Sequence, residues 1–123
     1  MGVAYNVRQA NGVTIVDLSG RITLGTGAPE SGVALHDLVR DLVKQGYKYI
    51  LLNLRDVTYL DSSGIGELFG CFTTVRSQSG VLKLSSPTER VQNLLRLTML
   101  NTVLDVMEDE SVAVRSFSKA GAA

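Results

Sequence analysis

A strand pattern that leads directly into a helix pattern constrains this chain more than any other feature. Residues 49–54 (Tyr-Ile-Leu-Leu-Asn-Leu) are apolar at nearly every position, which is typical of a strand covered on both faces. From about residue 63 to residue 77, apolar side chains recur at helical spacing; they are Ile65, Leu68, Phe69, Phe72 and Val75. The pattern therefore predicts a sheet with residues 49–54 at its centre and a helix packed on it.

The polar segment Asp61-Ser62-Ser63 lies where the strand pattern gives way to the helix pattern. Its side chains can accept hydrogen bonds from the free amide groups of the first helical turn, so they can be ordinary helix caps. Alternatively, a serine hydroxyl is displayed at a helix N-terminus, where the helix dipole favours the negative charge of a phosphate. The residue types by themselves leave both interpretations open.

The residues before this junction predict a hairpin, a loop and a helix. Strand-forming residues at 3–8 and 13–18 flank Asn11-Gly12, a hairpin signal, so the first two strands are expected to be antiparallel. Ser19-Gly20 is expected to end the second strand. Residues 24–32, with three glycines and a proline, predict a flexible loop. A helix is expected from about residue 31, with Gly46 as its natural end.

The residues after the junction predict two further βα pairs. Residues 81–84 predict a short strand. The segment Ser86-Pro87-Thr88-Glu89 predicts the start of a helix, because it combines an N-cap serine, a proline at the first helical position and a capping-box glutamate. Residues 102–106 predict the last strand, and the acidic residues 108–110 introduce a final helix. The residues of that helix expected to cover the sheet are Val112, Val114 and Phe117.

The resulting order, β-β-α-β-α-β-α-β-α, is that of an α/β fold. An antiparallel hairpin followed by βαβ units implies a mixed sheet of about five strands, with about four helices packed on it. At 123 residues the chain is expected to be one domain, with an ordered core at about 3–117 and a frayed tail at 118–123.

Small residues mark a second face of the predicted central helix, at Gly66, Gly70 and Thr73. Each interior helix glycine costs about 0.5–1 kcal/mol relative to alanine, so a close approach by another group is expected to compensate. Packing of a neighbouring helix and docking of a partner both remain open. Cys71 lies near the edge of the apolar face and is expected to be a small packing residue.

Motif spacing disfavours the common nucleotide-binding and hydrolase classes. The phosphate loop G-x-x-x-x-G-K-[ST] is absent, and Gly64-Ile65-Gly66 is followed by the next glycine one residue too late for G-x-G-x-x-G. Ser62 lacks the glycine two positions before it that a nucleophile elbow has. The only histidine, His36, is expected to be solvated on the polar side of its helix.

A metal or acid–base site is also disfavoured. One cysteine and one histidine offer no ligand cluster, so no cofactor or metal is expected. Asp56 and Asp61 are interpreted as turn or capping residues in preference to a catalytic pair.

Charge and hydropathy point to a protein partner or a small ligand. Twelve basic and twelve acidic residues leave no net charge, so direct binding to nucleic acid or to an anionic membrane is not expected. The apolar runs are far shorter than a membrane span, and the N-terminus lacks a secretion signal. A single cysteine fits a reducing compartment, so a cytoplasmic protein is expected. Its oligomeric state is expected to be a monomer or a weak dimer.

The central motif Asp61-Ser62-Ser63-Gly64-Ile65-Gly66, reached from the strand at 50–54, resembles the signature of the STAS domain of bacterial anti-anti-sigma factors (anti-sigma factor antagonists). The resemblance also covers residues 12–23, 46–49 and 94–106, and therefore most of the chain. In the family the first serine after the aspartate is the phosphorylation target. This corresponds to Ser62.

The resemblance implies partner switching without catalysis by the domain itself. An anti-sigma factor serine kinase phosphorylates the serine, the unphosphorylated protein binds that kinase so that a sigma factor is released, and a serine phosphatase resets the cycle. A constitutive scaffold or adaptor subunit with the same fold, in a stress-signalling assembly or a lipid-transport complex, is the alternative.

The partner-binding surface is expected at the central motif and beside it. Strand ends and the loops that join them usually carry function on such sheets. The chain departs from the family at Thr23, where members often carry an acidic residue, and in the longer loop at 24–32. The expected partner-binding residues are Thr23, Asp61, Ser62, Ser63, Gly64, Ile65 and Gly66.

Overall fold

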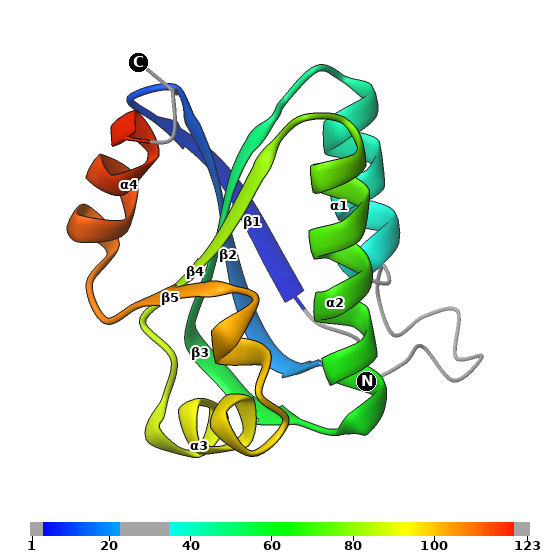
Figure 1. Cartoon of the computed structure of the whole chain (residues 1–123), viewed down its shortest axis with the longest axis vertical. Coiled ribbons are helices and arrows are strands. Elements are labelled where there is room, and N and C mark those ends of the chain that lie inside the picture. The colour runs from blue at the N-terminus through cyan, green and yellow to red at the C-terminus, as the bar shows by residue number, and fades with distance from the viewer. Residues whose placement is uncertain (1–3, 23–34, 120–123) are drawn as a thin grey trace.

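The computed structural model describes residues 4–22 and 35–119, and its strands form one mixed sheet (Figure 1). The elements are β1 (Ala4–Ala10), β2 (Val13–Ile22), α1 (Leu35–Lys44), β3 (Tyr49–Leu60), α2 (Ser62–Ser77), β4 (Val81–Ser85), α3 (Glu89–Leu97), a 3₁₀ helix (Leu100–Thr102), β5 (Asp105–Met107) and α4 (Glu110–Lys119). The strand order is β1-β2-β3-β4-β5, with β1 antiparallel to β2 and the other pairs parallel. The predicted mixed sheet, with β3 at its centre, is confirmed.

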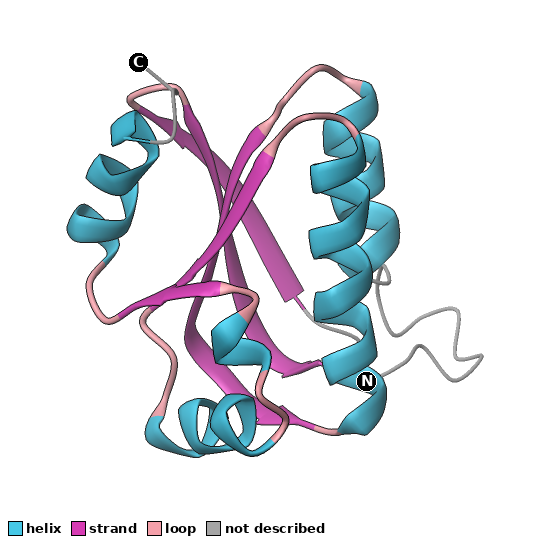
Figure 2. Cartoon of the chain, in the orientation of Figure 1, coloured by secondary structure: helices cyan, strands magenta, loops and turns pink. Residues whose placement is uncertain are grey.

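Helices cover both faces of this sheet (Figure 2). The larger core joins α1, α2 and α3 to the sheet, and the smaller core lies under α4. Successive residues of β3 point to opposite faces, as in any strand: Ile50 and Leu52 belong to the larger core and Leu51 to the smaller. This double coverage explains why the central strand is apolar at consecutive positions.

Strand β2 is longer than predicted, because it does not end at Ser19-Gly20. It continues to Ile22, and its register with β3 shifts between Gly20 and Arg21. Gly20 has a φ of 94°, a backbone conformation that glycine adopts without strain. A bulge of this kind keeps a glycine inside a strand, so the predicted break is wrong.

Strand β3 is longer for the same reason. Its pairing with the extended β2 continues to the match of Ile22 with Leu60. Residues 55–60 therefore belong to a strand, and the interpretation of Asp56 as a turn residue is wrong. The extra length brings the end of β3 directly to the start of α2.

Helix α3 begins later than predicted. The amide of Ser86 donates to the carbonyl of Met107 at 2.8 Å, at the end of β5, and Ser86 has a φ of 56°, a left-handed conformation and not the extended one of an N-cap. Instead Thr88 is the N-cap, and its hydroxyl accepts from the amide of Val91 at 3.2 Å. The 3₁₀ helix before β5 likewise delays the last strand, which begins at Asp105 and not at residue 102.

Helices α1 and α2 pack closely where a glycine leaves room. A Cβ on Gly70 would lie 3.1 Å from Nδ1 of His36, and Nε2 of His36 lies 2.7 Å from the hydroxyl of Thr74. Close helix packing is therefore confirmed at Gly70. The expectation of a solvated His36 is wrong.

The predicted stripe of α2 is confirmed at four of its five positions, because Leu68 and Val75 are buried and Ile65 and Phe72 pack on the larger core. The buried residues of α2 are Gly64, Leu68, Cys71 and Val75. Cys71 is a core residue as predicted, whereas Phe69 is 45% exposed. In α4, Val114 and Phe117 are buried as predicted. The third buried residue is Ala113 and not Val112, which is exposed.

One ion-pair group ties the edge of the sheet to α4. The guanidinium of Arg8 on β1 donates to both carboxylate oxygens of Asp17 on β2, and it also bonds Glu110 at the start of α4. The side-chain amide of Asn53 on β3 donates to the carboxylate of Asp17 at 2.7 Å. The hydrogen bonds from Arg8 are the main reason why the pKa of Asp17 lies below its usual range, and the bond from Asn53 lowers it further.

We expect Asp17→Asn to lower the free energy of unfolding by about 1 kcal/mol at pH 7. A lowered pKa means that the carboxylate stabilises the fold at neutral pH and loses this effect as the pH falls through its folded-state pKa. The difference between the two proteins should therefore shrink below about pH 4 in urea denaturation. Asp37→Asn, which removes the exposed pair with Arg40, is the control and should change little at either pH. An equal difference at both pH values would contradict this origin.

Candidate functional site

The junction between β3 and α2 is capped by Asp61. Its backbone is extended, with φ −106° and ψ −173°, and its Oδ1 accepts a hydrogen bond from the amide of Gly64 at 2.8 Å. The carbonyl of Asp61 accepts from the amide of Ile65 at 2.9 Å. The capping interpretation is therefore confirmed for Asp61, and α2 begins at Ser62.

Because Asp61 is the cap, the two serines after it are not needed for this role. Ser62 and Ser63 are both exposed, and no hydrogen bond among the described residues involves either hydroxyl. Both lie in the first turn of α2, where unpaired amide groups and the helix dipole favour negative charge. The geometry thus displays two free hydroxyls in a place that can accommodate an anion.

Gly64 holds the start of α2 against the end of β2. A Cβ on Gly64 would lie 2.0 Å from the carbonyl oxygen of Ile22 and 2.6 Å from Cδ1 of Leu60. Only a residue without a side chain permits this approach of backbone to backbone. By contrast, a Cβ on Gly66 would meet nothing within 4 Å. Two glycines of the same motif therefore have different roles.

The structure brings six of the predicted partner-binding residues together, since residues 61–66 form one continuous corner of the molecule. Gly64 is buried, Ile65 is half-buried and packs on the larger core, and Gly66 is exposed. Thr23 and the loop at 24–32 lie outside the described residues.

An aromatic–cation pair lies beside this corner, and sequence reasoning missed it. Arg21, near the end of β2, places its guanidinium 4.5 Å from the ring centre of Tyr59 on β3. The two residues are register partners in the β2–β3 pairing. The family resemblance covers Arg21 without giving it a role, and the predicted end of β2 at residue 20 placed Arg21 outside the sheet.

Tyr59 also forms one wall of an open hollow of about 490 Å³ between β3 and α3. The hollow is mostly apolar, and Leu97 at its rim is 81% exposed. Its lining residues are Tyr59, Leu60, Arg90, Asn93, Leu94 and Leu97. Because Leu60 directly precedes Asp61, this hollow adjoins the corner that carries the two serines.

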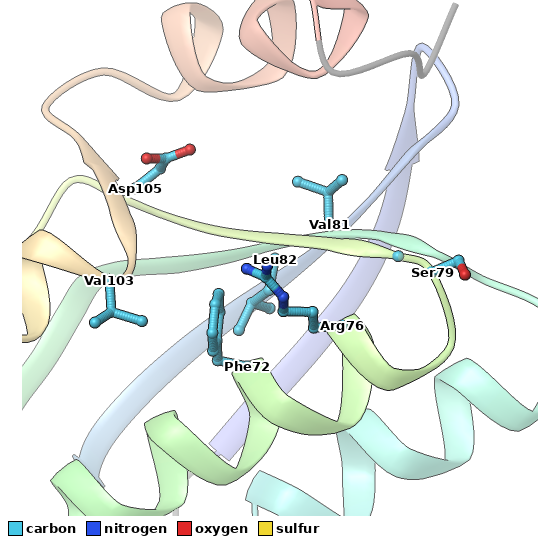
Figure 3. Close-up of a pocket in the computed structure, with 8 residues that line it drawn as sticks. Phe72, Arg76, Ser79, Val81, Leu82, Val103 and Asp105 are labelled. Atoms are coloured by element: carbon cyan, nitrogen blue, oxygen red, sulfur yellow. The ribbon is translucent and has the colours of Figure 1, made fainter.

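A second hollow, of about 370 Å³, lies at the far end of α2 (Figure 3). There Arg76 lies over the ring of Phe72, 5.8 Å from its centre, and Val103 and Asp105 approach from the other side. Arg76 is about 21 Å along the helix from Ser62, given a rise of 1.5 Å per residue. This hollow is therefore separate from the corner at Ser62.

The described residues offer neither a metal site nor a reactive thiol. They contain no group of three or more His, Cys, Asp or Glu side chains that could hold a metal ion. Burial raises the pKa of the Cys71 thiol, so this cysteine stays protonated and is not a nucleophile. Among the helices described, none is long and apolar enough to cross a membrane.

Comparison with known proteins gives a consistent result. The family model for the STAS domain matches residues 4–113. The anti-sigma-B factor antagonist of Bacillus subtilis is 31% identical over 106 residues, which cover 86% of this chain and 92% of that protein.

Two solved structures share the fold. An anti-sigma factor antagonist from Mycobacterium paratuberculosis superposes with a TM-score of 0.77 at 20% identity, covering 94% of this chain and 93% of the other. The Bacillus cell fate determinant SpoIIAA, in its phosphorylated form, superposes with a TM-score of 0.65 at 18% identity, covering 92% and 99%.

Proposed function

The chain belongs to the STAS domain family, and we propose that it is an anti-sigma factor antagonist switched by phosphorylation of Ser62. In the unmodified state it binds an anti-sigma factor and so frees a sigma factor for transcription. Phosphorylation ends this binding, and a serine phosphatase restores it. The protein is then a cytoplasmic binding module and a substrate of other enzymes, without a reaction of its own.

The free hydroxyl of Ser62 is the observation that carries this proposal. It is exposed, it makes no hydrogen bond with the other described residues, and it lies in the first turn of α2 directly after the Asp61 cap. A kinase can therefore reach the hydroxyl without unfolding the helix. In the transfer, the serine oxygen bonds to the γ-phosphoryl group of ATP, ADP leaves and the hydroxyl proton is released to the kinase.

The surface around Ser62 is suited to binding another protein. The exposed serines and Gly66 lie beside the apolar hollow that Tyr59 and Leu97 line. Interfaces commonly combine such an apolar pocket with a polar rim, and a new charge in their centre is poorly tolerated. We propose that the partner covers both this hollow and the first turn of α2.

The decisive experiment is a phosphorylation assay. The purified protein is incubated with ATP and the anti-sigma kinase that it binds, and the modified residue is identified by mass spectrometry. Phosphate should appear on Ser62, and Ser63→Ala should be modified at the same rate. Phosphate confined to another residue would reject the switch. The absence of any phosphate would also reject it, provided that the same kinase preparation phosphorylates a known substrate. The protein would then be a constitutive scaffold or adaptor.

Phosphorylation of Ser62 should leave the fold nearly as stable as before. A phosphate adds about −1.5 to −2 charges, which the N-terminus of α2 favours, while the neighbouring Asp61 adds some repulsion. We expect the thermal midpoints of the two forms to agree within a few degrees in scanning calorimetry. A loss of about 10 °C would mean that the modification acts by unfolding α2 and not by blocking the partner.

A further inference from the structure

Strand β1 (dark blue in Figure 1) is one of the two edges of the sheet, and its outer side is open. It runs for seven residues, Ala4–Ala10, and among the described residues no strand pairs with it on that side. The opposite edge, β5, has only three residues, Asp105–Met107. A very short edge strand gives another chain little to pair with, so β5 is protected by its length and β1 is not.

The turn after β1 shows which of its backbone groups point outward. Asn11 and Gly12 both have a positive φ, 51° and 80°, as in a type I′ turn. Such a turn joins the residues on either side of it, here the register partners Ala10 and Val13, by a hydrogen bond, so the backbone groups of Ala10 point to β2. This direction alternates along a strand. The N–H and C=O groups that point away from the sheet therefore belong to Tyr5, Val7 and Gln9.

Apolar side chains accompany this open edge. Tyr5 and Val7 are register partners of Leu18 and Val16, which are buried in the larger core. Register partners share a face of the sheet, so Tyr5 and Val7 lie on the face of the larger core. Nevertheless Tyr5 is 45% and Val7 36% exposed. The apolar surface of this face thus continues to the edge, where the described residues leave it partly uncovered.

Strand β1 lacks the devices that usually prevent pairing with another chain. Lysine, proline and bulges serve this purpose at open edges, and β1 contains none of them. Its one charged residue, Arg8, is bound to Asp17 and to Glu110 of α4, which covers the opposite face. A second strand can therefore approach without leaving a charge unpaired.

We propose that β1 pairs with β1 of a second copy of this chain, antiparallel and about a two-fold axis at Val7, so that the dimer has one continuous sheet. Val7 is the middle residue of the strand, so in this register every outward N–H and C=O group of both copies finds a partner. Arg8 then lies opposite Asn6 of the second copy, whereas an axis at Arg8 would oppose two guanidinium groups.

A second copy fits this edge better than an unrelated strand does. One two-fold contact pairs both open edges at once and brings together the Tyr5 and Val7 side chains of the two copies. The edges that remain outside are the two β5 strands, which are too short to continue the sheet. The assembly therefore closes as a dimer.

The test is analytical ultracentrifugation of the full-length protein at increasing concentration. The interface is small, so we expect a weak dimer that forms at about 100 µM protein. Val7→Lys should require at least about tenfold more protein to associate, because two lysines would lie opposite each other at the axis. Val112→Lys is the matched control, since it places the same side chain at a similarly exposed valine on α4, and it should associate like the unmodified protein.

Amide hydrogen exchange locates the interface independently. The amides of Tyr5, Val7 and Gln9 face solvent in the monomer and should exchange more slowly as the protein concentration rises. The amides of Asn6 and Arg8 point to β2, so their exchange should be slow at every concentration and change little.

A protein that stays monomeric up to about 1 mM would overturn the proposal. Equal association of the two lysine variants would overturn it too, as would a dimer whose newly protected amides lie outside β1. None of these results bears on phosphorylation of Ser62, because the inference does not rest on the proposed function.

Discussion

Ser62→Asp should weaken the complex with the anti-sigma factor by about a thousandfold. If the partner covers Ser62, the new carboxylate loses water without gaining a cation, and an unpaired buried charge costs about 4 kcal/mol. The loss should not come from unfolding, because an acidic residue at the first position of α2 interacts favourably with the helix dipole. Isothermal titration calorimetry with the unmodified and variant proteins measures the difference directly.

Ser62→Ala should bind the partner with nearly wild-type affinity and resist phosphorylation. The cap of α2 is Asp61, and the Ser62 hydroxyl makes no hydrogen bond among the described residues, so its removal costs the fold little. Gln78→Glu adds the same charge at the other end of α2 and serves as the control for a general charge effect. Equal dissociation constants for the aspartate and alanine variants would reject the switch and favour the scaffold role.

Gly64→Ala should destabilise the protein by at least about 3 kcal/mol. The added Cβ meets the backbone oxygen of Ile22 at 2.0 Å, and backbone cannot rotate away as a flexible side chain does. Relief requires α2 to separate from the end of β2, which disturbs the core around Leu60. For a chain of this size, we expect a thermal midpoint lower by about 10 °C or more.

Gly66→Ala is the matched control, and its effect should have the opposite sign. A Cβ there meets nothing within 4 Å, and the residue lies inside the same helix. Alanine is favoured over glycine in a helix by about 1 kcal/mol, so the thermal midpoint should rise by a few degrees. If both variants were equally destabilised, the close approach at Ile22 would not be the reason for Gly64.

Local patterns predicted much of the fold because each depends on neighbours in the chain. Hairpin chemistry at Asn11-Gly12, consecutive apolar residues in β3 and helical spacing in α2 all follow from the periodicity of one element. The capping role of Asp61 is equally local, since its side chain bonds an amide three residues later. The central position of β3 was predictable because only a strand covered on both faces needs such a run.

Predictions failed where a distant part of the chain decided the outcome. Ser86 is followed by the residues of a capping box, but its amide is bonded to Met107 on β5 and its backbone is left-handed, with a φ of 56°, so Thr88 caps the helix instead. His36 has a polar sequence environment, yet α2 packs over it beside Gly70. In each case a contact between elements outweighed a local preference.

The candidate site divides in the same way. Asp61 and the two serines were recognisable from the sequence, because a polar segment between strand and helix has few possible roles. The need for glycine at 64, the freedom of the Ser62 hydroxyl and the placement of Arg21 on Tyr59 were decided only by the tertiary structure. The first and the third depend on the length of β2, which continues through Gly20 because pairing with β3 compensates for the bulge. The sequence alone predicted the junction; the paired ends of β2 and β3 determine what surrounds it.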